Sequence, residues 1–161
     1  METWEAVEKM IDFYHGNIHD IEHFLKVYAL ARTIGKGEGL ELSELKTLEL
    51  AAIVHDIACP VCREKYGNTN EKYQEAESEP LVREFFSGTD TPPEMVERIV
   101  SLVSRHHTYT NVDGDDCRIL LEADFLVNAG EKSLPPASVS SAQEKIFETK
   151  TGKRLLLLLF P

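Results

Sequence analysis

The sequence predicts an all-α fold, a bundle of about six to seven helices. Apolar residues recur three and four positions apart along most of the chain, and glycines or prolines stand where these periodic stretches end. No stretch shows the alternation of apolar and polar residues that is typical of a strand. With 161 residues, the chain can form one sizeable core but not two ordinary domains. We therefore expect a single domain over residues 1–161.

The first part of the chain predicts three helices. The first covers residues 4–14, and the second runs from Asp20, a suitable N-cap, to the glycine-rich segment 35–39. Glycine ends helices because it readily adopts a left-handed conformation. The third helix, 43–59, becomes almost wholly apolar after Leu50 until a proline stops it. An apolar helix of this kind passes through a core, so it carries its few polar side chains inward.

The rest of the chain predicts further helices separated by polar segments. Residues 62–74 are polar and contain a glycine and two asparagines, so we expect a loop that leads into the next helix. Prolines at a first helical turn and apolar spacing predict the other helices. The expected ranges are 71–87, 92–106, 119–130 and 140–150, followed by the apolar tail LLLLLF.

Composition excludes several classes of partner. The net charge of −11 repels a phosphate backbone, and no basic run offsets it, so we expect no polymeric nucleic acid as a partner. No apolar run reaches the roughly 18 residues of a membrane span, and the N-terminus lacks the features of a secretory signal. We therefore expect no membrane partner and a cytoplasmic location. The apolar tail needs a cover, for which we expect either a homodimer or the first helix of the same chain.

The dipeptide His55-Asp56 is the most informative pair. Both residues lie in an otherwise apolar helix, where an unpaired polar group is costly. A neutral imidazole and a carboxylate together suit a divalent first-row metal, although a hydrogen-bonded structural pair would also satisfy them. His23 and Asp124 are likewise embedded in apolar helical patterns.

The order His23, His55-Asp56 and Asp124 resembles the H…HD…D signature of the HD-domain superfamily of metal-dependent phosphohydrolases. The segments HFLKVYALA, LAAIVHDIA, EKYGNTNEKYQE, SRHHTYTNVDG and LLEADFLVN are similar to those of small single-domain HD proteins, over residues 17–155. The resemblance implies a helical HD domain with one divalent ion held by these four residues. Mn, Fe, Mg, Ni, Co and Zn are all candidates for the ion.

Some HD proteins bind a second metal through histidines at the end of one helix and the start of the preceding one. His106 and His107 stand at the first of these places, but the preceding helix contains no histidine. A second site would need a carboxylate there, most plausibly Glu77. We therefore expect one metal, and we assign His106 and His107 to substrate phosphate.

The resemblance implies hydrolysis of a small phosphorylated metabolite, with nucleotides as the favoured class, by attack of a metal-activated water on phosphorus. Asp56 and Asp124 hold the ion in this hypothesis, and either Asp124 or Glu77 accepts the proton of the water. Lys26 follows His23 by one helical turn, and we expect it to bind phosphate together with Lys72.

Three alternatives stay open at this point. The site could be that of an HD-type di-iron oxygenase, a non-enzymatic module that binds a nucleotide or a metal, or a helical scaffold with hydrogen-bonded core histidines. The segment ACPVC carries Cys59 and Cys62, which we expect to be free thiols because no further ligands complete a zinc site. We expect His15 and His19 to face solvent.

Overall fold

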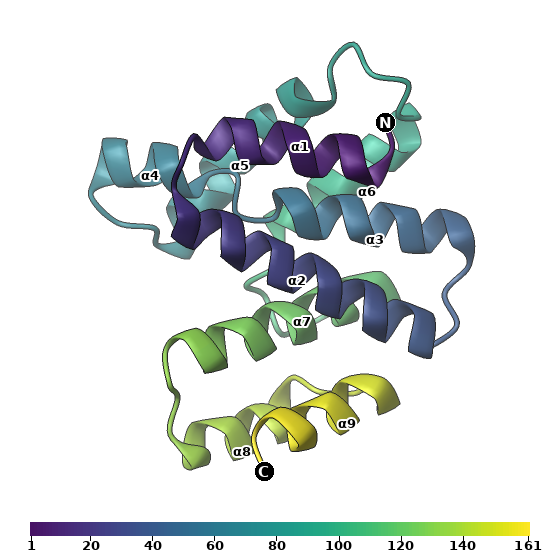
Figure 1. Cartoon of the computed structure of the whole chain (residues 1–161), viewed down its shortest axis with the longest axis vertical. Helices are drawn as coiled ribbons and strands as arrows, with labels where there is room; N and C mark the ends of the chain where they lie inside the picture. Colours follow the sequence, from purple (N-terminus) through teal and green to yellow (C-terminus); the bar gives the residue numbers. More distant parts are fainter.

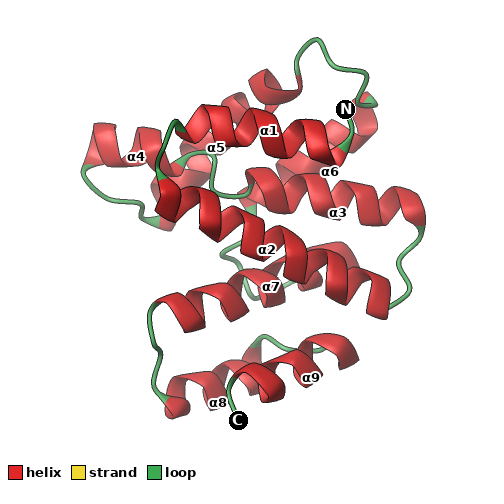
Figure 2. Ribbon diagram, in the orientation of Figure 1, coloured by secondary structure: helices red, strands yellow, loops and turns green.

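The computed structural model describes residues 1–161 and consists of nine helices without a strand (Figures 1 and 2). The helices are α1 (Thr3–Tyr14), α2 (Ile18–Gly37), α3 (Leu42–Val54), α4 (Cys59–Tyr66), α5 (Glu71–Phe86), α6 (Pro93–Ser104), α7 (Asp115–Glu131), α8 (Pro136–Lys145) and α9 (Lys150–Leu159). The all-α prediction is confirmed. The number of helices exceeds the predicted number because α4 forms in the expected loop and α9 forms in the apolar tail.

Helices α2 and α3 lie at the centre of the molecule (Figure 1). Helix α2 packs against α3 on one side and against α7 on the other. Helix α1 covers α3, and α5 and α6 pack against each other behind these two helices. Helices α8 and α9 lie beyond α7, at the end of the molecule opposite α1. This arrangement brings α2, α3 and α7 into mutual contact.

Helix α3 forms the middle of the core. Every residue from Leu48 to Val54 is buried, so the helix is enclosed on all sides, as its apolar sequence predicted. The helix ends at Val54, earlier than expected, and residues 55–58 form a tight turn. Pro60 lies in the first turn of α4, where its missing N–H removes no helical hydrogen bond. The turn places His55 and Asp56 at the end of a buried helix.

A buried carboxylate attaches α9 to α7. Glu122 is completely buried, and its Oε1 accepts hydrogen bonds from the backbone N–H groups of Glu148 at 2.7 Å and Thr149 at 3.0 Å. The hydroxyl of Thr149 donates to its other oxygen. In α9 itself Leu156 is buried, whereas Leu157 and the two leucines after it are more than half exposed. No helix combines the length and the apolar character needed to cross a membrane.

Candidate metal centre

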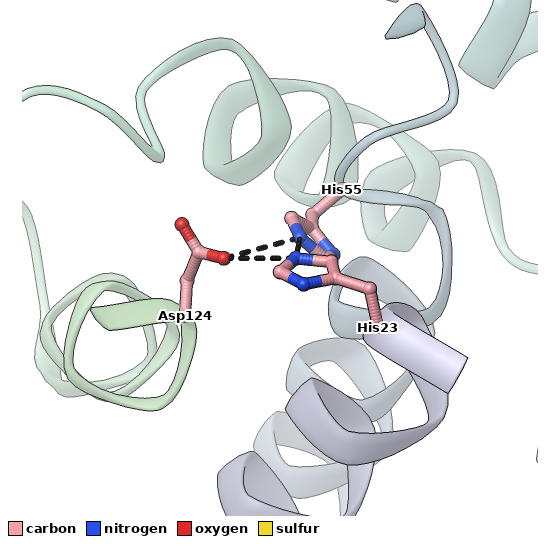
Figure 3. A group of neighbouring side chains, drawn as sticks. All are labelled: His23, His55 and Asp124. Carbon is pink, nitrogen blue, oxygen red and sulfur yellow. Dashed lines mark hydrogen bonds and ion pairs between the residues drawn. The ribbon is translucent and has the colours of Figure 1, made fainter. Parts of the chain in front are cut away.

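Three side chains from α2, the end of α3 and α7 meet inside the molecule (Figure 3). The Nε2 atom of His23 lies 3.2 Å from Nε2 of His55 and 3.2 Å from Oδ1 of Asp124. The same carboxylate oxygen lies 3.4 Å from Nε2 of His55. All three residues are buried. The contacts of α2 with α3 and α7 therefore bring together residues that are far apart in the sequence.

Asp56 lies between this group and a third histidine. Its Oδ2 atom is 3.3 Å from Nε2 of both His23 and His55, and its Oδ1 atom is 3.3 Å from Nε2 of His106. His106 lies in the turn after α6 and is buried. The carboxylate of Asp56 thus presents one oxygen to His23 and His55 and the other oxygen to His106.

The outer nitrogen of each of these imidazoles is fixed by a hydrogen bond. In all three rings, Nδ1 faces an oxygen that can only accept: the Ala52 carbonyl for His55 at 2.7 Å, the Val103 carbonyl for His106 at 2.7 Å and the Glu131 carboxylate for His23 at 2.9 Å. Each Nδ1 must therefore carry the proton. In a neutral imidazole, the lone pair is then on Nε2, which points to the centre of the group.

This geometry suits a divalent cation. Donor atoms bound to one ion at about 2.0 to 2.2 Å in tetrahedral or octahedral geometry are separated by about 2.8 to 3.6 Å, and the observed separations of 3.2 to 3.4 Å lie in this range. Nε2 of His106 is buried without a hydrogen-bond partner, which is costly unless another group satisfies it. Imidazole nitrogens and carboxylate oxygens are ligands that first-row divalent metals accept. The residues present therefore fit the metal that the sequence implied.

The acid–base properties of the group are consistent with a bound cation. Burial disfavours a charge on His23, but the carboxylates of Asp124 and Asp56 outweigh it and raise the pKa of the imidazole. Burial also opposes ionisation of Asp124, yet the two facing imidazoles hold its pKa below the usual range. The carboxylates are therefore ionised at neutral pH. A divalent ion would supply the positive charge that protons on the imidazoles otherwise provide.

A cleft of about 860 Å³ opens above the group, and His23, Asp56 and Asp124 are among the residues that line it. Three cationic side chains of lysine or arginine also line the cleft. Arg63 is neutralised, because its guanidinium donates two hydrogen bonds to Asp20, at 2.6 and 2.9 Å.

The other two cations of the cleft are lysines from two different elements. Lys72 comes from α5 and Lys132 follows the end of α7. Neither forms an ion pair, and the ammonium group of Lys72 lies 4.7 Å from the ring centre of Tyr73. The predicted residue Lys72 thus lines the cleft, whereas Lys132 was not predicted from the sequence.

Two predicted residues lie elsewhere. The carboxylate of Glu77 accepts hydrogen bonds from Lys65 at 3.0 Å and from the Tyr66 hydroxyl at 2.7 Å, so this position on α5 turns it toward α4 and away from the cleft. The ammonium group of Lys26 is half exposed and lies 3.3 Å from Oε1 of Glu131, outside the cleft. The structure therefore brings neither Glu77 nor Lys26 to the lining of the cleft, where the predicted roles in proton transfer and phosphate binding would place them.

His106 and His107 are adjacent in the sequence but differ in their surroundings. His106 was assigned to substrate phosphate, but it does not line the cleft; it faces Asp56 and forms a second group of candidate ligands with Asp56 and His55. His107 lines the cleft as expected, with its Nε2 atom 3.4 Å from the side-chain oxygen of Gln74. Burial, together with the neighbouring His106, lowers the pKa of His107 to about 4, so its imidazole is neutral at neutral pH.

Other residues considered from the sequence take no part in the group. His15 ends α1 in a left-handed conformation and is exposed, and the side chain of His19 is 76% exposed at the rim of the cleft. Cys59 and Cys62 are free and buried, in agreement with the expected free thiols. Glu131 was missed, although it follows Asp124 by seven residues and so lies on the same face of α7.

Comparison with known protein families agrees with the geometry. The model of the HD domain matches residues 20–133, which is more than half of the chain and includes every residue of the group. No curated protein and no solved structure matches the chain. The HD domain is the domain of a superfamily of metal-dependent phosphohydrolases. On the strength of this match and of the cluster of histidines and aspartates, the chain belongs to the HD domain family.

Proposed function

We propose that the protein is a metal-dependent phosphohydrolase that acts on a small phosphorylated metabolite, with nucleotides as the favoured class. One observation carries this proposal: imidazole nitrogens and carboxylate oxygens converge at a cleft that also contains two unpaired lysines. A binding site for a divalent cation and a binding site for an anion are thereby adjacent, as hydrolysis of a phosphate ester requires.

In this proposal His23, His55, Asp56 and Asp124 hold the ion. When bound, a divalent ion supplies a Lewis acid, which polarises a phosphoryl oxygen and lowers the pKa of a coordinated water toward neutrality. Asp124 lines the cleft, and in this proposal its carboxylate accepts the proton of the attacking water. Glu77 has no role, because it does not reach the cleft.

The walls of the cleft support a phosphorylated substrate. Lys72 and Lys132 both line the cleft, and in this proposal they offset the charge on the phosphoryl oxygens. Tyr109 and Phe125 line the same cleft and provide aromatic surface against which a nucleobase can pack. The combination of lysines and aromatic side chains in one cleft favours a nucleotide over a smaller phosphate ester.

The test is a hydrolysis assay on metal-free protein supplied with Mn²⁺, using a panel of nucleotides and simple phosphomonoesters. We expect release of phosphate that depends on Mn²⁺ and is lost in Asp56→Asn, which keeps the size of the side chain. Glu97→Gln is the matched control, because Glu97 is an exposed carboxylate that pairs with Arg83 outside the cleft. Turnover that persists after the metal is removed would contradict the proposal.

A second candidate is an HD-type oxygenase with two iron ions. It is favoured by one observation, that Asp56 presents Oδ2 to His23 and His55 and Oδ1 to His106, the arrangement of a carboxylate that can bridge two ions. Anaerobic loading with Fe²⁺ separates the candidates. Two iron ions per chain, with oxygen uptake on addition of an organic substrate, would support the oxygenase. One ion per chain and phosphate release would support the hydrolase.

A further inference from the structure

One helix contacts both nitrogens of the His23 ring. Asp124 and Glu131 lie seven residues apart on α7 and hence on the same helical face. Oδ1 of Asp124 is 3.2 Å from Nε2 of His23, and Oε2 of Glu131 is 2.9 Å from Nδ1. Asp124 therefore faces the metal-binding edge of the imidazole, whereas Glu131 faces the opposite edge.

The hydrogen bond of Glu131 differs from those of the other two imidazoles. His55 and His106 each donate Nδ1–H to the carbonyl of the residue three positions earlier in their own chain segment, a neutral acceptor. His23 donates to a carboxylate that comes from another helix. A hydrogen bond to an ionised acceptor is stronger than one to a neutral acceptor, and it makes the other ring nitrogen a better electron donor.

Lys26 holds this carboxylate in place. Its Nζ atom lies 3.3 Å from Oε1 of Glu131, so the two oxygens of Glu131 face two residues of α2, His23 and Lys26. The side chain of Glu131 is only 18% exposed, so these two contacts fix its orientation inside the molecule.

We infer that Glu131 is a positioning residue for the metal centre. It fixes the tautomer and the orientation of His23 and strengthens the donor character of Nε2, and Lys26 assists by holding Glu131. This inference rests on the proposed metal binding by His23. It also gives Lys26 a role that replaces the predicted contact with phosphate.

The experiment measures binding of Co²⁺ to the metal-free full-length protein by competition with a chromogenic chelator, together with the visible absorption spectrum of the bound ion. The variants are Glu131→Ala, Glu131→Gln and Lys26→Met, with His23→Ala as a variant that removes the ligand itself. Glu97→Gln is the matched control for loss of a carboxylate outside the site. Melting of each metal-free variant shows whether it is folded.

We expect Glu131→Ala to raise the Kd for Co²⁺ by roughly 10 to 100-fold and to shift the absorption bands, because the ligand field changes with the orientation of the ring. Glu131→Gln, which still accepts a hydrogen bond, and Lys26→Met should give smaller increases. A folded Glu131→Ala protein with the Kd and the spectrum of the wild type, while His23→Ala loses Co²⁺, would overturn the inference and leave the metal site intact. Failure of the wild type to bind any Co²⁺ would instead overturn the proposed function, and the inference with it.

Discussion

Loss of the metal should lower the stability of the whole protein. The four proposed ligands come from α2, α7 and the turn after α3, so the unfolded chain does not keep them together. An ion that binds only the folded state adds RT ln(1 + [M]/Kd), which is about 4 kcal/mol at a free concentration of a thousand times Kd. In a chain of this length, each kcal/mol shifts the melting temperature by roughly 2 to 4 °C. We therefore expect a difference of roughly 8 to 16 °C between the metal-bound and the metal-free protein.

The assay is thermal melting followed by circular dichroism, on chelator-treated protein with and without Mn²⁺, Fe²⁺, Co²⁺, Ni²⁺ or Zn²⁺. Asp56→Asn should lose most of the shift, since Asp56 faces His23, His55 and His106. Glu97→Gln should keep the full shift. If no ion raises the melting temperature of the wild-type protein, then the buried imidazoles and carboxylates satisfy one another and the reasoning from their geometry is refuted.

Four further predictions concern α9 and the cleft. Glu122→Ala removes three hydrogen bonds to a buried carboxylate and should lower the free energy of unfolding by about 3 kcal/mol, measured in urea. Burial raises the pKa of Glu122 above its value in the unfolded chain, so the folded state binds the proton more tightly. The free energy of unfolding of the wild type should therefore fall, relative to that of Glu122→Gln, as the pH rises from the unfolded to the folded pKa. A difference between the two proteins that stays constant with pH would contradict this prediction. Gly152→Ala places a methyl group against Glu122 and should cost about 2 kcal/mol in the same urea assay, whereas Gly130→Ala, with nothing within 4 Å, should be neutral or stabilising. Lys72→Ala and Lys132→Ala should each raise KM in the phosphate-release assay, and unchanged KM for both would remove the lysines from the substrate site.

The sequence was most informative where a physical rule admits few solutions. His55 and Asp56 stand out because polar groups in an apolar helix must be satisfied, and both prove to lie at the centre of the buried group. The apolar run after Leu50 likewise indicated a buried helix, which α3 is. The point at which α3 ends was less predictable, since Pro60 is compatible both with the end of a helix and with the first turn of the next one.

Sequence and structure differ at contacts between elements that are distant in the sequence. Lys26 was chosen from helical spacing, which gives the neighbours along one helix but not the element that a face meets. Glu77 was chosen as a carboxylate on the helix before His106, in place of a missing histidine. The structure shows that Glu77 meets α4, a helix that was expected to be a loop, and that Lys26 meets the end of α7. The contact of Glu131 with His23 spans 108 positions, and no local pattern encodes it.

The placement of Asp124 and Glu131 on α7 has a consequence for biosynthesis. During translation the chain emerges from its N-terminus, so His23, His55, Asp56 and His106 are all synthesised before the first residue of α7. Until α7 docks against α2, the imidazoles of His23 and His55 lack the carboxylate of Asp124. His23 also lacks Glu131, the acceptor that orients its ring. If the ion binds as proposed, the full set of four ligands exists only after α7 has docked, so tight binding of the ion follows the docking of the seventh helix.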